Sequence, residues 1–357
     1  MPSRKQTVDA LRDAFQQRNL TLYLGAGVSV ANGLPTWEKL VLAMYFSAIS
    51  HEKMGGWRPF PNYLFAIAEW HLARSDEPLE ITARKIRQYY TDPGDFLHSL
   101  RETLYVGLSS FDQPDKVELI VSELRGANAT LDAVARLCEA GFAAGAGVKS
   151  VVTYNYDNLL ETVLHQQPVQ PIWSAVTPAE DVVPVYHVHG YVPPEAQEGS
   201  QPHQIIFTED QYHLAAQDAY AWSNLVQLHT MSSSVGLMVG LSLADRNMRR
   251  LLDALTRTAL PLRIYALLQE EKWEAPTTAA LDGIHEKAQQ YMEKFERSGV
   301  KRPGVKADWR GEIEAILHEV ERVGRKQKTQ VLEQIGVTPL WYKAHEEIPA
   351  ILAEIYT

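Results

Sequence analysis

Cysteine is almost absent from this chain of 357 residues, which contains one, Cys138. A single thiol cannot form an internal disulfide or supply the four cysteines of a structural zinc site. The chain also has no run of about 18 apolar residues that could span a bilayer. Residues 1–9 lack the apolar core of a signal peptide. We therefore expect a cytoplasmic protein in a reducing compartment, with no membrane partner.

Basic residues are fewer than acidic residues in this chain. Lysine and arginine total 34 against 44 aspartates and glutamates, so the formal net charge is −10, and no basic stripe is evident. Proteins that bind the phosphate backbone cluster their positive charges, so we expect no direct nucleic-acid binding. Hydrophobic residues make up 45% of the chain, which is enough for the large buried core of a folded globular protein.

Short apolar runs alternate with helical patterns along most of the chain. This alternation predicts an α/β fold of Rossmann-like type, with a mostly parallel sheet and helices on both faces. Residues 52–147 are different, because they show helical patterns without a convincing strand. We interpret them as a large helical insertion within one domain that covers residues 1–357. The predicted strands are residues 20–24, 150–154, 184–188, 205–207, 235–240, 262–268 and 337–341.

A glycine-rich turn follows the first predicted strand. Residues 25–29 read Gly-Ala-Gly-Val-Ser, and residues 33–37 read Gly-Leu-Pro-Thr-Trp. Glycines allow the backbone to approach a phosphate closely. Val30 occupies the place of the third glycine of the dehydrogenase fingerprint, and no Gly-Lys-Ser/Thr follows for a Walker A loop. A tight turn without a ligand is the alternative.

Polar residues stand at the ends of two further predicted strands. Asn155, which follows Thr153-Tyr154, could orient a ribose hydroxyl or a water. Asp157 either joins that site or caps the next helix. In the run from Val185 to Gly190, strand alternation predicts that His187 and His189 share one face. A structural histidine or a metal ligand is the alternative for His189, but no supporting acidic or thiol spacing indicates a metal, and we expect none.

The strand over residues 235–240 ends in a similar turn. Ser242 could meet a phosphate or a ribose, and Asp245 is predicted to cap the helix that follows. The second glycine of a nucleophile elbow is missing after this serine, which disfavours a serine hydrolase.

In this order, the four turns resemble the SIR2 (sirtuin) family, and residues 335–352 look like the tail of bacterial SIR2-like domains. The resemblance implies an NAD⁺ site. By this likeness, Asn155 and His189 would be catalytic, and the diphosphate and adjacent ribose would lie against the glycine turn. The remaining binding residues implied in this way are Gly25, Ala26, Gly27, Ser29, Pro35, Thr36, Trp37, Asp157, Gly240 and Ser242.

The departures from deacylating sirtuins indicate a particular branch. The zinc ribbon with its four cysteines is absent, and Thr36-Trp37-Glu38 replaces the usual Asp-Phe-Arg. SIR2-like domains of bacterial antiviral systems share these departures and hydrolyse NAD⁺ to ADP-ribose and nicotinamide. The resemblance thus implies an NAD-depleting effector of anti-phage defence. It also implies a homo-oligomer and a separately encoded regulatory partner, such as a motor ATPase or an Argonaute-like protein. The alternatives are a zinc-free deacylase or ADP-ribosyltransferase, and a non-catalytic sensor of NAD⁺ or ADP-ribose.

Overall fold

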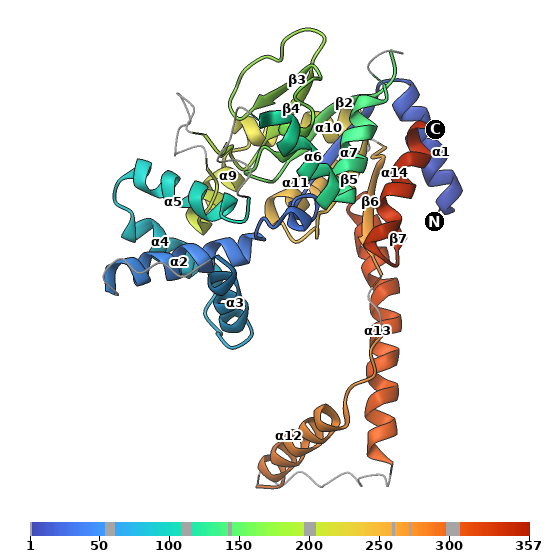
Figure 1. The fold of residues 1–357 in the computed structure, drawn as a ribbon. Coiled ribbons are helices and arrows are strands. Elements are labelled where there is room, and N and C mark those ends of the chain that lie inside the picture. Colours follow the sequence, from blue (N-terminus) through green and yellow to red (C-terminus); the bar gives the residue numbers. More distant parts are fainter. Residues whose placement is uncertain are drawn as a thin grey trace. The chain divides into compact units, whose positions relative to one another are not determined.

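The computed structural model describes residues 2–53, 61–108, 116–141, 145–195, 205–258, 261–270, 273–297 and 308–357. The chain divides into two compact units, one formed by residues 1–269 with 334–357 and the other by residues 270–333. The first unit contains a sheet of seven parallel strands in the order β3-β4-β2-β1-β5-β6-β7 (Figure 1). This confirms the predicted α/β, Rossmann-like fold. The strands are β1 (Leu20–Leu24), β2 (Val148–Thr153), β3 (Val169–Ile172), β4 (Val183–His187), β5 (Val235–Val239), β6 (Ile264–Gln269) and β7 (Val337–Tyr342).

Helices connect the strands. In the described part of residues 52–147, every regular element is a helix. The helices of the first unit are α1 (Arg4–Gln16), α2 (Trp37–Lys53), α3 (Pro61–Leu72), α4 (Leu79–Tyr89), α5 (Pro93–Tyr105), α6 (Val117–Ala127), α7 (Ala129–Glu139), α8 (Leu159–Val163), α9 (Glu209–Gln217), α10 (Trp222–Ser233), α11 (Arg246–Thr256) and α14 (Ile348–Tyr356).

The central strand β1 is buried on both faces. All five of its residues are buried, as expected for a strand in the middle of a parallel sheet. Leu22 and Leu24 belong to the hydrophobic core that also contains residues of α1, α7 and α14. Tyr23 points to the other face, where its hydroxyl donates to Thr230 of α10 over 3.0 Å. The two faces are therefore covered by different helices, and the loops at the strand ends remain for a site.

Two sequence predictions about strands need correction. The sequence patterns do not predict the edge strand β3, whose short run contains Pro171 and is mostly half-buried. Residues 205–207 were predicted as a strand, but they form none. Their backbone groups are used elsewhere: the Ile206 amide donates to the His189 carbonyl over 2.9 Å, and the Phe207 amide donates to Gln211 Oε1 over 2.8 Å.

The second unit is built from α12 (Thr278–Arg297) and α13 (Trp309–Gln334). The His285 ring of α12 stacks on Trp309 of α13, with ring centroids 4.1 Å apart. Arg310 donates to Asp282 over 2.7 Å, so polar and aromatic contacts join the two helices. Within the described ranges, no helix combines the length and the apolar character that crossing a membrane requires.

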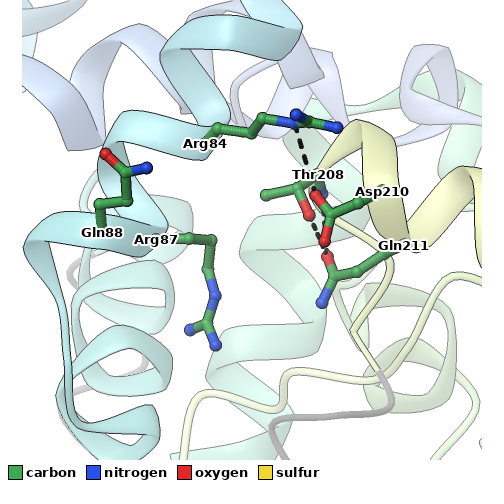
Figure 2. Close-up of a pocket in the computed structure, with 6 residues that line it drawn as sticks. All are labelled: Arg84, Arg87, Gln88, Thr208, Asp210 and Gln211. Atoms are coloured by element: carbon green, nitrogen blue, oxygen red, sulfur yellow. Dashed lines mark hydrogen bonds and ion pairs between the residues drawn. The ribbon is translucent and has the colours of Figure 1, made fainter.

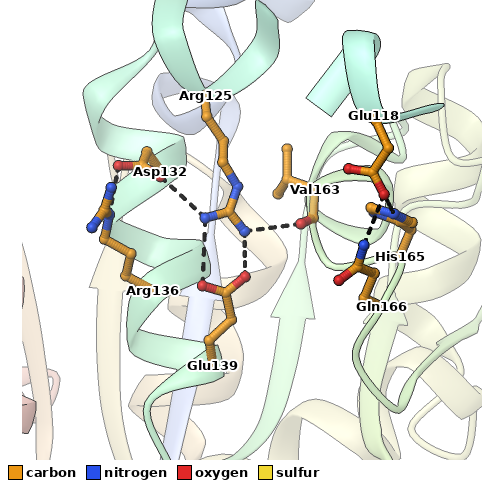
Figure 3. Close-up of polar contacts among 8 residues, drawn as sticks. All are labelled: Glu118, Arg125, Asp132, Arg136, Glu139, Val163, His165 and Gln166. Carbon is orange, nitrogen blue, oxygen red and sulfur yellow. Dashed lines mark hydrogen bonds and ion pairs between the residues drawn. The ribbon is translucent and has the colours of Figure 1, made fainter. Parts of the chain in front are cut away.

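Arg125 joins three helices of the first unit (Figure 3). From α6, it donates to Asp132 of α7 over 3.2 Å and to the Val163 carbonyl at the end of α8 over 2.9 Å, and it also pairs with Glu139 of α7. Its side chain is only 22% exposed, whereas that of Arg136, which pairs with the same Asp132, is 61% exposed. The arrangement predicts that these two arginines contribute very differently to stability.

We expect Arg125→Met to lower the free energy of unfolding by about 2–4 kcal/mol, because it leaves a carboxylate and a carbonyl without their donor in a shielded place. Arg136→Met is the matched control and should cost less than about 1 kcal/mol, as exposed ion pairs do. Urea denaturation of the three proteins measures the difference. Equal losses for the two variants would show that the Arg125 cluster has no special role.

Candidate functional site

The glycine turn after β1 lies against the turn after β5. The Gly25 amide donates to the Val239 carbonyl over 3.1 Å, and the Gly27 amide donates to the Gly240 carbonyl over 3.0 Å. A Cβ on Gly27 would lie 2.8 Å from the Gly240 Cα, which is too close for any side chain. Both glycine amides are thus already used within the protein. What these glycines provide is the close approach of two loops at the carboxyl edge of the sheet.

Asn155 connects this turn to the turn after β2. Its Nδ2 donates to the Gly25 carbonyl and to Ser29 Oγ, each over 3.1 Å. Ser29 Oγ in turn donates to Asp157 Oδ2 over 2.9 Å. Since the Nδ2 hydrogens are used by the protein, the group that Asn155 can offer to a ligand is its Oδ1 acceptor. A hydroxyl that donates, such as one on a ribose, is the partner that fits an acceptor.

Asp157 contacts both the Ser29 network and the start of α8, whose N-cap is Asn158. Its Oδ2 belongs to the Ser29 network, while its Oδ1 accepts from the Leu159 amide over 3.1 Å at the start of α8. The side chain is buried, and burial raises its pKa from 3.8 to about 6, although the two hydrogen bonds act in the opposite direction. The carboxylate therefore ionises at a cost to the folded protein.

The Asp157 pKa predicts a pH-dependent stability. A folded-state pKa above the unfolded value means that this carboxyl group favours folding most below pH 3.8, and that this contribution is lost as the pH rises through 6. We expect the free energy of unfolding of the wild type, relative to Asp157→Asn, to fall by up to about 3 kcal/mol between pH 4 and pH 7. Denaturation at several pH values measures it. The control is Asp253→Asn, an exposed aspartate on α11. A difference that stays constant with pH would contradict the assignment.

The two histidines at the end of β4 do not continue one strand, contrary to the prediction. β4 ends at His187, and residues 188 and 189 form a turn, so strand alternation stops before His189. His187 Nε2 lies 2.6 Å from Glu161 Oε1, and its Nδ1 lies 3.2 Å from the Asn155 carbonyl. His187 thus contacts the backbone of the Asn155 turn and the side chain of Glu161. His189 has a separate set of partners.

His189 lies in a cage of aromatic rings beside a carboxylate. The rings of Tyr154 and Tyr212 approach its imidazole edge-on, with centroids 5.0 and 5.4 Å away, and its Nε2 lies 3.4 Å from Asp245 Oδ2. Burial lowers the pKa of His189, against the opposing effects of Asp245 and of a hydrogen bond with the Tyr154 backbone. The imidazole is therefore neutral at neutral pH, which is the form that can accept a proton.

Asp245 contacts His189, although the sequence pattern predicts it only as a helix cap. Its Oδ1 does accept from the Met248 amide over 2.6 Å at the start of α11, as predicted, while Oδ2 faces His189. The available signal was its position after β5, at the same sheet edge as the other candidates. Tyr212, on α9, had no comparable signal in the sequence.

The remaining predicted residues lie around these two clusters. Trp37 packs against Phe207 with ring centroids 6.5 Å apart. Burial raises the pKa of Tyr212, and the charge of Glu38, which follows Trp37, adds to the rise. Ser242 is exposed, and its Oγ accepts from the Ala244 amide over 3.3 Å. Pro35 and Thr36 are half-buried just before α2, while Ala26 is half-buried and Gly27 is exposed at the turn.

The loop over residues 240–245 joins the two clusters. Its first residue, Gly240, contacts Gly27, and its last, Asp245, contacts His189. The structure therefore gathers the predicted residues at one edge of the sheet, where open α/β sheets bind their ligands. Among the residues that the structure describes, no group of three or more His, Cys, Asp or Glu side chains is placed to hold a metal ion.

Comparison with known protein families gives a match over part of the chain. No curated protein gives a match to the chain. Residues 149–292 match the family model of the SIR2-like domain, and this stretch holds both Asn155 and His189. The resemblance found in the sequence is thus confirmed, at the level of the family, over residues 149–292.

Proposed function

We propose that this protein is an NAD⁺ glycohydrolase that cleaves NAD⁺ to ADP-ribose and nicotinamide. The SIR2-like domain indicates NAD-related enzymatic activity. The observation that carries the finer proposal is the pairing, at one sheet edge, of an acceptor on Asn155 with a buried neutral imidazole backed by Asp245. A ribose held by the first and a proton acceptor beside it are what glycosidic cleavage needs.

Cleavage of NAD⁺ needs no general acid to protonate the leaving group. When the bond between the ribose C1′ and the pyridinium nitrogen breaks, the electron pair goes to nicotinamide, which leaves as a neutral molecule. Positive charge then develops on the ribose, and the oxygen of a water bonds to C1′. Asn155 Oδ1 orients a ribose hydroxyl, and His189 accepts the proton of that hydroxyl or of the water. Asp245 stabilises the imidazolium that results.

Covalent catalysis by the single thiol does not compete with this mechanism. Cys138 lies buried in the hydrophobic core on α7, where burial raises its pKa to about 12. The reactive form of a cysteine is the thiolate, which such a pKa suppresses at neutral pH. The titratable group suited to proton transfer at the candidate site is therefore His189.

Incubation of the purified protein with NAD⁺ tests the proposal. We expect nicotinamide and ADP-ribose to appear in equal amounts by chromatography, with NAD⁺ binding measured in parallel by calorimetry. Binding without release would fit either the sensor alternative or a hydrolase that still lacks its partner. A mass increase on a second protein that scales with nicotinamide release would favour an ADP-ribosyltransferase. If the protein neither bound NAD⁺ nor released nicotinamide, the proposal would be contradicted.

Regulation is part of the proposal, because an uncontrolled NAD⁺ hydrolase depletes the cell that makes it. We propose that the protein acts in anti-phage defence and is held inactive until a homo-oligomer or a complex with a separately encoded motor ATPase or Argonaute-like protein forms. The support is the sequence resemblance described above, which is an analogy at the level of the family. Full activity of the isolated monomer would contradict this part of the proposal and leave the hydrolase assignment intact.

A further inference from the structure

A cavity lies between α4 and the beginning of α9, in the first unit (Figure 2). Its volume is about 520 Å³, within the range of small-molecule sites. The residues that line it are Arg84, Arg87, Gln88, Thr208, Asp210 and Gln211. None of them belongs to the NAD⁺ site proposed above, so this cavity needs an explanation of its own.

The two arginines of this cavity differ in their partners. Arg84 has two carboxylates within 3.6 Å, those of Glu209 and Asp210. Arg87 pairs with no carboxylate of a described residue, and its Nη1 is buried without a hydrogen-bond partner among them. A buried donor without an acceptor is costly, and the cost is larger when the group is charged. The charge of Arg87, which lines the cavity and has no carboxylate partner among the described residues, is therefore the feature that favours an anionic ligand.

The Arg87 guanidinium is held in place by the aromatic core. Its Cζ lies 4.2 Å above the ring of Phe96, which in turn packs edge-on against Phe207 with centroids 5.3 Å apart. An arginine stacked on an aromatic ring keeps its fork of donors in a fixed plane. This geometry suits bidentate contact with an anion and costs little ordering entropy when the anion binds.

Amide groups complete the lining of the cavity. Oε1 of Gln211 already accepts from the Phe207 and Thr208 amides, over 2.8 and 2.9 Å, and from Thr208 Oγ1, over 3.1 Å. This leaves its Nε2 as the group to offer a ligand. Figure 2 shows the Gln211 amide and the Arg87 guanidinium on opposite sides of the same space, with Gln88 on the α4 side. One negative charge is also present, that of Asp210, and it is paired with Arg84.

We propose that this cavity binds the phosphate group of a small molecule, with Arg87 as its charged anchor and the amides of Gln88 and Gln211 as further donors. Donors from three side chains match the three free oxygens of a phosphate monoester better than the two of a carboxylate. The cavity is also larger than a single ion needs, so the organic part of an ester has room. The site does not depend on NAD⁺ cleavage, and its test is a binding measurement.

Calorimetry on the full chain tests the site with two probes, inorganic phosphate and ribose 5-phosphate. We expect the wild type to bind at least one of them and Arg87→Met to bind it at least tenfold more weakly. Gln88→Leu, an exchange at an exposed position on α4, should weaken binding several-fold without endangering the fold. The matched control is Arg322→Met, which removes the same charge from an exposed position on α13 and should bind as the wild type does.

The two probes separate the possible sources of the phosphate. Tighter binding of ribose 5-phosphate would show that an ester fills the cavity, and equal binding would show that the anion alone is recognised; both results support the site. No wild-type binding of either probe at millimolar concentration would overturn the proposal. Binding that persists unchanged in both Arg87→Met and Gln88→Leu would overturn it as well, because the phosphate would then lie elsewhere, such as at the glycine turn.

Discussion

Replacement of His189 by alanine is expected to lower the rate of nicotinamide release from NAD⁺ by at least about a hundredfold, the usual contribution of a positioned acid–base group. NAD⁺ binding should change little, because the Asn155–Ser29–Asp157 network and the glycine turn do not contact His189 in this structure. The measurement is the initial rate of nicotinamide release, with calorimetry for binding. A variant that cleaves NAD⁺ at the wild-type rate would remove His189 from the mechanism.

Two further variants make this result specific. His213→Ala is the matched control, since His213 lies on α9 beside Tyr212 with its side chain 58% exposed, and its loss should leave the rate unchanged. Asp245→Asn keeps an oxygen for the Met248 amide and removes only the negative charge opposite His189. We expect it to slow nicotinamide release less than His189→Ala does. The imidazolium would lose the negative charge that stabilises it, but the base itself would remain. A full rate in Asp245→Asn would show that the carboxylate serves only as a cap.

Sequence patterns predict β1 and β5 to within one residue at each end, and both strands are buried along their whole length. Each is a mostly apolar run followed by glycine, and such runs have few other interpretations. β3 escaped prediction because an edge strand is covered less, tolerates Pro171, and so lacks the continuous apolar run. Residues 205–207 are an apolar run, but they make no backbone hydrogen bonds to a neighbouring strand. The amides of residues 206 and 207 donate to His189 and Gln211 instead.

The candidate site was predictable to the extent that it depends on strand ends. The carboxyl ends of parallel strands meet at one edge, so Asn155, Asp157 and Gly240 could be expected to gather with the glycine turn. The partners of His189 could not, because they depend on how loops and helices fold back after the strands. The sequence pattern predicts Asp245 as a helix cap. That its second carboxylate oxygen lies beside His189 is known only from the structure.

The sequence patterns also do not predict that residues 270–333 form a separate compact unit. A helix that packs on the sheet and a helix that packs on another helix have the same apolar spacing. The sequence shows α12 and α13 as helical, and only contacts such as that of His285 with Trp309 show which surface each helix covers.

Replacement of Gly240 by alanine is expected to cause the largest loss of stability of any small substitution at the site. Its φ of +68° is unfavourable for a residue with a Cβ, and that Cβ would lie 2.7 Å from the Val28 amide nitrogen and 2.9 Å from the Gly27 carbonyl carbon. Backbone strain and overpacking each cost about 1–3 kcal/mol, so we expect a loss of about 3 kcal/mol or more in the free energy of unfolding. NAD⁺ binding should fall at least tenfold, because the β1 and β5 turns must move apart.

Gly33→Ala separates the two causes of that loss. Gly33 also has a positive φ, +88°, but a Cβ there would meet no atom within 4 Å. Alanine at this position should cost only the strain of its backbone conformation, about 1 kcal/mol, and should leave NAD⁺ binding near the wild-type value. Urea denaturation and calorimetry on both variants give the comparison. If Gly240→Ala proved no more harmful than Gly33→Ala, the contact between the two turns would not be what holds the site together, and the glycines would serve conformational freedom alone.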